Sequence, residues 1–173
     1  MRSIFLFIGF FTVLFLDFSF ASVSPFSLLG SDVYFVPKLL FMMLLLVSIY
    51  FGRSYSIFFS IVFGVILDLY TGSIYGIHLF GFVAFVLFMH SAFRVFYRDM
   101  IGLFFVVIVN TFLFDLYIYG IYKVVGYIDL PVFDYIALRA VPSLLLNALL
   151  YIPLLIFVLV LRKIRKNVFT KHA

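Results

Sequence analysis

The sequence contains no cysteine, no glutamate and no tryptophan. Without cysteine there is no disulfide bond and no thiolate metal site, and redox chemistry says nothing about the compartment. Without glutamate, the His-Glu-x-x-His zinc helix is impossible, and His78, His90 and His172 are too far apart to form a ligand pair on one helix. A glycine-rich phosphate loop and a serine nucleophile elbow are missing as well. We therefore predict that the protein is not an enzyme and uses no metal or cofactor.

Charged residues are also scarce. They make up 11% of the 173 residues, whereas 67% are hydrophobic and 23% aromatic; a soluble domain is about one-quarter charged. One small globular core cannot hide this much apolar surface, so we predict an all-α polytopic membrane protein with a single membrane domain over residues 1–173. The net charge of +5 is then first a topology signal, and we expect no nucleic-acid partner.

Six apolar runs divide the chain. The predicted transmembrane spans are residues 4–20, 34–51, 55–70, 76–93, 100–122 and 141–161, and a basic tail at 162–173 follows them. The first run ends in Phe-Ala-Ser-Val-Ser, as a cleaved signal peptide does. Asp17 inside this run is unusual for a signal peptide and favours a retained span, but both readings stay open at this point.

The basic residues predict the orientation of the chain. With six spans, nine of the twelve Lys and Arg residues fall on one side of the membrane. They are Arg2, Arg53, Arg94, Arg98, Arg162, Lys163, Arg165, Lys166 and Lys171, and the other side has Lys38, Lys123 and Arg139. Because positive residues are retained in the cytoplasm, both termini are predicted to be cytoplasmic. Loss of the first span would leave the remaining five in the same orientation.

The stretch from Ser60 to Gly81 differs from its apolar surroundings. Ser60, Gly64 and Asp68 recur every four residues and so share one helix face. Gly72, Gly76 and Gly81 extend this set of small residues beyond the helix. Small residues allow a neighbouring backbone to come close. We predict a face for helix packing, either within the chain or against the helix of a partner.

Three aspartates lie inside predicted spans at the same depth. Asp17, Asp68 and Asp115 each follow the cytoplasmic end of their span by 15 or 16 residues, which places them about 22–24 Å into an apolar core of about 30 Å. Charge in a membrane is costly and is often functional. One hypothesis is an outward-facing polar cluster of these aspartates with His78 and Arg139. The alternative is that each aspartate caps a helix or reaches outward to water.

Other polar residues have more ordinary interpretations. Four of them lie inside the last two spans and are expected to form structural hydrogen bonds: Asn110, Thr111, Ser143 and Asn147. The basic tail is represented by Arg162, Lys163, Arg165 and Lys166. It either reports topology alone or binds anionic membrane lipids or a cytoplasmic partner.

The run Phe63-Gly64-Val-Ile-Leu-Asp68-Leu-Tyr-Thr-Gly72-Ser-Ile-Tyr-Gly76-Ile-His-Leu resembles the signature of the rod shape-determining protein MreD family. The chain length, Pro37 with Lys38, Asp115-Leu and the final Leu161-Arg-Lys-Ile-Arg-Lys166 agree with this resemblance. The resemblance implies a six-helix arrangement similar to the substrate-binding components of energy-coupling-factor transporters. It also implies a multi-pass protein of the bacterial inner membrane.

The resemblance further implies the partners MreC, the MreB filament, RodA and the penicillin-binding transpeptidase of RodA. On this reading the protein is a non-enzymatic scaffold that links the filament to peptidoglycan synthesis during cell elongation. A second hypothesis is a small-molecule binding or transport component that uses the outward polar cluster as its pocket. Co-purified elongation proteins would favour the first hypothesis, and stabilisation by a vitamin-sized ligand would favour the second.

Overall fold

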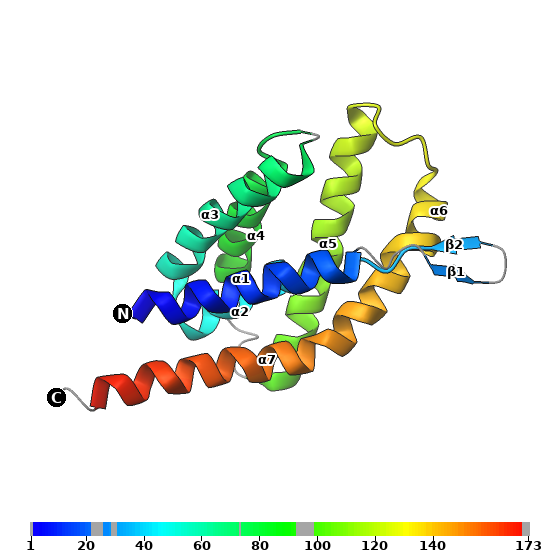
Figure 1. Ribbon diagram of the computed structural model, residues 1–173. Coiled ribbons are helices and arrows are strands. Elements are labelled where there is room, and N and C mark those ends of the chain that lie inside the picture. Colours follow the sequence, from blue (N-terminus) through cyan, green and yellow to red (C-terminus); the bar gives the residue numbers. More distant parts are fainter. Residues whose placement is uncertain (1, 22–25, 29–30, 73, 93–98, 171–173) are drawn as a thin grey trace.

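The computed structural model describes residues 2–21, 26–28, 31–72, 74–92 and 99–170. Almost all of this chain is helical (Figure 1). The helices are α1 (Arg2–Ala21), α2 (Leu39–Tyr50), α3 (Arg53–Thr71), α4 (Ile77–Ala92), α5 (Met100–Val124), α6 (Val132–Tyr135) and α7 (Val141–Thr170). Two short antiparallel strands, β1 (Phe26–Leu28) and β2 (Ser31–Val33), form a hairpin between α1 and α2. The start of α1 and the end of α7 lie on the same side of Figure 1.

Helix α2 occupies the centre of the bundle. It contacts α1, α3, α4, α5 and α7, and every residue from Leu39 to Ser48 is buried. Its sequence is apolar on all sides, which is the pattern of a helix surrounded by other helices. Aromatic stacking ties it to its neighbours: the Phe41 ring lies 4.2 Å from the Phe114 ring of α5, measured between centroids.

The predicted span 34–51 is only partly helical. Residues 34–38 are extended, and α2 begins at Leu39, because Pro37 lacks an amide hydrogen and Lys38 keeps non-helical backbone angles. Twelve helical residues cover about 18 Å, and five extended ones add about 16 Å, which together match an apolar core of about 30 Å. Such non-helical backbone at membrane depth must be buried in protein.

Helices α3 and α4 form the closest pair in the bundle. Gly72 ends α3 with a left-handed φ of 63°, and its amide donates to the Asp68 carbonyl oxygen. Gly76, with φ of 96°, precedes the first residue of α4. These conformations cost glycine little and other residues much more. The short turn between the helices therefore depends on both glycines.

The end of the chain is more helical than predicted. A π-helix, Ile136–Ala140, joins α6 to α7, so residues 132–170 form one helical segment that includes Pro153. The stretch between the predicted spans 100–122 and 141–161 thus contains a helix, and the predicted basic tail stays helical to Thr170. No glycine follows Gly126, and residues that favour helix, such as Leu, Ala, Arg and Lys, flank the span 141–161, which explains why helix forms on both sides of it.

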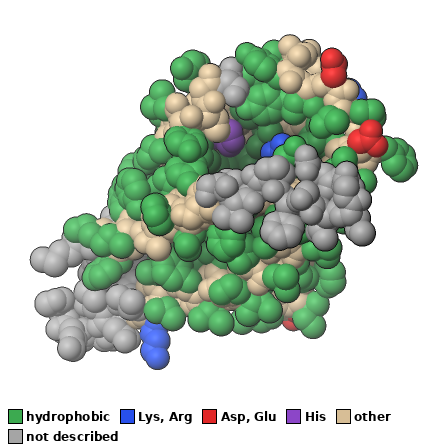
Figure 2. All heavy atoms as spheres, turned by 45° about the vertical axis from the view of Figure 1, so that its right-hand side comes forward, with side chains coloured by type: hydrophobic (Ala, Val, Ile, Leu, Met, Phe, Trp, Pro, Cys, Tyr) green, Lys and Arg blue, Asp and Glu red, His purple; other side chains and the backbone are tan. Residues whose placement is uncertain are grey.

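Three helices are long and apolar enough to cross a membrane: Arg53–Thr71, Met100–Val124 and Val132–Lys163. Three shorter apolar helices are Ile4–Phe20, Leu39–Tyr50 and Ile77–Met89. Hydrophobic side chains also cover most of the face in Figure 2. A chain with this surface is a membrane protein, and the number of crossings stays a prediction.

Candidate functional site

Asp68 closes the turn between α3 and α4. Its Oδ2 accepts hydrogen bonds from the amides of Gly76 and Leu79, both at 3.0 Å, and its Oδ1 accepts one from the amide of His78 at 2.9 Å. The Nδ1 atom of the His78 ring also lies 3.0 Å from Oδ1. These amides are unpaired donors at the start of α4, where a carboxylate is favoured by the helix dipole. Asp68 therefore acts as a buried cap for the next helix.

The small residues of this motif have different roles. A methyl group added at Gly64 would lie 2.6 Å from the Leu79 Cα atom, so Gly64 sets the close contact between α3 and α4. A methyl group at Gly81 would lie 2.8 Å from the rings of Phe114 and Tyr117. Ser60 is fully buried. No described atom lies within 4 Å of a methyl group added at Gly72, so this glycine makes no close packing contact within the described chain. Gly64 and Gly81 make their contacts within the chain, and docking of a partner helix on this face stays a prediction.

Asp17 caps a second helix. Its Oδ1 and Oδ2 accept hydrogen bonds from the amides of Leu39 and Leu40, at 2.9 and 2.8 Å. These are the first two residues of α2, whose N-terminal amides would otherwise be unpaired in an apolar environment. A charged residue in α1 thus stabilises the point where the extended segment becomes helix.

Asp115 has a different partner. Its Oδ1 lies 3.0 Å from the Nζ atom of Lys38, and only 10% of the Lys38 side chain and 5% of the Asp115 side chain are exposed. The Lys38 ammonium also lies 5.0 Å from the centre of the Phe114 ring. The two ions belong to segments far apart in the sequence, and the Lys38 side chain is buried within the protein. This buried ion pair links the start of α2 to the middle of α5.

The predicted cluster members are connected through intermediate residues. Lys38 interacts electrostatically with Asp17 and His78 as well as pairing with Asp115. The Tyr135 hydroxyl donates to the carbonyl oxygen of Asp115 at 3.3 Å. Arg139 lies over the Tyr135 ring, 5.7 Å from its centre. Contacts through Lys38 and Tyr135 therefore connect the five residues, and an outward-facing cluster stays a prediction. Figure 2 shows a histidine and a basic side chain in a hollow of this face.

The extended segment 34–38 is held by polar side chains of α7. Ser143 accepts from the amide of Val36 at 3.0 Å, and Asn147 accepts from the amide of Lys38 at 2.8 Å. Both side chains also donate to backbone carbonyls of this segment. Asn110 and Thr111, in contrast, donate to carbonyls of their own helix, α5. The expected structural hydrogen bonds thus connect different segments at Ser143 and Asn147, whereas those of Asn110 and Thr111 stay within α5.

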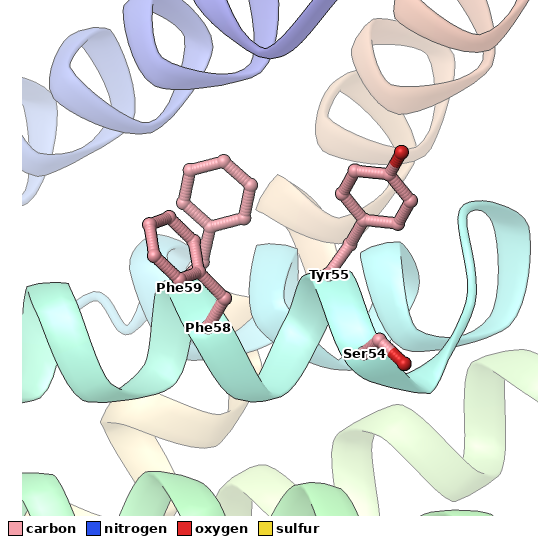
Figure 3. Close-up of a pocket in the computed structure, with 4 residues that line it drawn as sticks. All are labelled: Ser54, Tyr55, Phe58 and Phe59. Atoms are coloured by element: carbon pink, nitrogen blue, oxygen red, sulfur yellow. The ribbon is translucent and has the colours of Figure 1, made fainter.

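Two adjoining pockets lie near the junction of α5, α6 and α7. Their volumes are about 450 and 350 Å³, and both are lined by Ile128, Tyr135 and Arg139. A third pocket of about 320 Å³ lies beside α3 and is lined by Ser54, Tyr55, Phe58 and Phe59. Figure 3 shows its three aromatic rings on the same side of α3. The third pocket is apolar, whereas the other two combine aromatic walls with a guanidinium group.

The basic tail is described only in part. Arg162 lies over the Tyr50 ring, 5.3 Å from its centre, and Lys163 is exposed. The side chains of Arg165 and Lys166 lie outside the described residues, although the backbone there is helical. Among the residues that the structure describes, no group of three His or Asp side chains could hold a metal ion.

The comparison with protein families identifies the family of the chain. Residues 1–165 match the rod shape-determining protein MreD. The chain belongs to the MreD family. Members of the MreD family are shape-determining membrane proteins, and MreD is not a known enzyme family. The comparisons with curated proteins and with solved structures found no match.

Reasoning from the sequence missed two residues that organise the site of this MreD family protein. The charge count predicts only the side of the membrane for Lys38, whereas its buried ammonium is the partner of Asp115. Tyr135 lies between the predicted spans 100–122 and 141–161, but it is 2% exposed and its ring stacks on Tyr119 at 4.0 Å. A signal for Lys38 existed: one lysine follows a proline directly, and an apolar helix follows the lysine. No local signal pointed to Tyr135.

Proposed function

We propose that this protein is a non-enzymatic scaffold of the cell-elongation machinery in the bacterial inner membrane. It crosses the membrane six times, with both termini in the cytoplasm, and its helix arrangement is similar to that of substrate-binding components of energy-coupling-factor transporters. Its partners are MreC, the MreB filament, RodA and the penicillin-binding transpeptidase of RodA. Through these contacts it couples the cytoplasmic filament to peptidoglycan synthesis.

One observation carries this proposal beyond the family match: the carboxylates inside the bundle are engaged within the chain. Asp17 and Asp68 cap helices, and Asp115 pairs with Lys38. A transport site needs polar groups that can exchange their partners in the protein for a ligand. The three aspartates of this protein instead stabilise the bundle itself. A bundle held rigid from within and apolar outside is suited to present fixed helix surfaces to the transmembrane helices of partners.

The orientation can be tested with single cysteines, because the natural chain has none. Ser54→Cys introduces an exposed thiol at the start of α3, and Tyr75→Cys introduces one in the turn that follows the end of α3. In spheroplasts, an impermeant maleimide should label the Tyr75→Cys variant and leave the Ser54→Cys variant unlabelled until the membrane is permeabilised. Labelling in the reverse order would contradict the proposed topology.

The scaffold role is tested by affinity purification of the full chain from membranes. MreC or RodA should co-purify, and depletion of the protein should turn rod-shaped cells into spheres. Recovery without any elongation protein, together with a higher unfolding temperature in the presence of a vitamin-sized ligand, would overturn the scaffold role and favour a binding or transport component.

A further inference from the structure

The two pockets that share Arg139 form a built site that the scaffold role does not use. The larger one is also lined by Tyr34, Leu130, Asp134 and Leu138. Its volume of about 450 Å³ is in the usual range for small-ligand sites. Most of its wall is aromatic or aliphatic, and it contains one cation and one anion. A matching ligand therefore carries an anionic group, a cationic group and an apolar part.

Arg139 is the cation of this pocket, and its own hydrogen bonding is incomplete. Its Nε atom is buried and has no hydrogen-bond partner among the described residues, and no described carboxylate lies within ion-pair distance of the guanidinium. Its one described contact of note is with the Tyr135 ring. A buried guanidinium donor without an acceptor is costly. A guanidinium also matches the oxygens of a phosphate group in geometry and charge.

The π-helix explains why Arg139 shares a pocket with Asp134. Residues five apart on an α-helix diverge by about 140° around the axis. In a π-helix the hydrogen bond joins residues five apart, and the Val141 amide bonds to the Ile136 carbonyl in this way. The extra residue therefore brings positions 134 and 139 toward the same side, and both line the larger pocket. Helices of the π type are frequent at functional sites.

The surroundings of the pocket have the composition of a membrane interface. Tyr119, Tyr122 and Tyr127 line the smaller pocket, and tyrosine is enriched at the level of lipid headgroups. Exposed apolar side chains, such as Phe133 at 87% exposure, lie between the exposed Asp129 and Asp134. A segment with this mixture lies at the boundary between water and hydrocarbon. The ligand available at that level is a phospholipid.

We propose that this pocket binds the headgroup of phosphatidylethanolamine. The Arg139 guanidinium binds the phosphate diester, the Asp134 carboxylate binds the primary ammonium, and Leu130 and Leu138 contact the glycerol and the first acyl carbons. Asp134 is exposed and selects a headgroup with a positive charge over an anionic one. This lipid site is independent of the scaffold role and would hold in a protein with another function.

The test uses the full chain, purified in detergent and stripped of lipid, with thermal unfolding followed by circular dichroism. Phosphatidylethanolamine should raise the unfolding midpoint more than phosphatidylglycerol or phosphatidylcholine does. Arg139→Gln should lose most of this shift. Arg53→Gln is the matched control, because Arg53 is an exposed arginine at the start of α3, and it should keep the whole shift.

Asp134→Asn keeps the proposal testable if Arg139→Gln fails to fold. This exposed substitution should abolish the preference for phosphatidylethanolamine over phosphatidylglycerol, or reverse it, while stabilisation by phospholipid persists. An unchanged preference in Asp134→Asn would overturn the proposal, as would equal shifts with all three lipids in the natural protein. Soluble glycerophosphoethanolamine at the same concentration should give no shift, and an equal shift would overturn the assignment to a membrane lipid.

Discussion

Asp68 and Asp115 are both buried carboxylates on apolar helices, but they are neutralised in different ways. Asp68 is bound by backbone amides and a histidine that lie 8 to 11 residues further along the chain. Asp115, in α5, is paired with Lys38, which directly precedes α2, and the helices α2, α3 and α4 separate the two residues along the chain. One is a local cap, and the other is a long-range ion pair.

The difference determines how costly each group is to disturb. A cap shares its charge among several fixed amide dipoles, so the loss of the charge leaves those amides with a weaker acceptor. A buried ion pair has two full charges, and the removal of one leaves the other without compensation in an apolar interior. Stability should therefore be more sensitive to the Lys38–Asp115 pair than to Asp68.

The largest effect is expected from Lys38→Met, which removes one ion of the buried pair. The expected loss of stability is about 3–5 kcal/mol, measured by thermal unfolding in detergent with circular dichroism. Lys123→Met is the control, because Lys123 is an exposed residue that donates to Tyr119 and to a carbonyl. The double variant Lys38→Met with Asp115→Leu should regain much of the loss. Equal effects of Lys38→Met and Lys123→Met would show that the pair is not buried.

Gly64→Ala should have the next largest effect. The new methyl group would meet the backbone of α4 at 2.6 Å, and backbone cannot move away as a side chain can. We expect a destabilisation of about 1–3 kcal/mol. Gly120→Ala is the matched control in α5, where nothing lies within 4 Å of the added methyl group. That change should be neutral or stabilising, and a loss at both sites would disprove a specific contact at Gly64.

Asp68→Asn tests the local cap. The carboxamide keeps one acceptor oxygen where the carboxylate has two, so we expect a loss of about 1–2 kcal/mol. Asp99→Asn is the control, since Asp99 precedes α5 but its side chain makes no capping hydrogen bond. Recovery of MreC should fall only as far as stability falls. Lower recovery at unchanged stability would instead show that the Asp68 carboxylate contacts a partner.

The smallest effect is expected from Ser143→Ala in α7. It removes two hydrogen bonds to the extended segment 34–38, and such bonds contribute about 0.6 kcal/mol each in membranes. The expected loss is thus about 1 kcal/mol, measured in the same unfolding assay. Thr12→Ala is the control, because Thr12 is exposed and bonds within its own helix. A loss well above that of Asp68→Asn would reverse the order of the comparison.

Some properties of this protein follow from the order of residues along the chain. Apolar runs predict helices, because hydrophobicity and helix geometry are local or nearly local properties. The four-residue spacing of Ser60, Gly64 and Asp68 predicts a packing face for the same reason, whereas a helix cap at Asp68 is one of the interpretations that the sequence leaves open. The MreD family resemblance rests on this same stretch, and the family match confirms it.

Other properties exist only in the folded bundle. Three features join segments that are separate runs in the hydropathy pattern. They are the pairing of Lys38 with Asp115, the hydrogen bonds between α7 and residues 34–38, and the pocket around Arg139. Packing among all the helices decides which one lies at the centre. The sequence of α2 is apolar on every side, so it does not show which of its faces contacts which neighbour. Residue order therefore predicts the apolar helices, the small-residue face from Ser60 to Gly81 and the family, whereas the cap made by Asp68 and the pairing of the other charges exist only in the fold, because electrostatic partners are selected by distance in space.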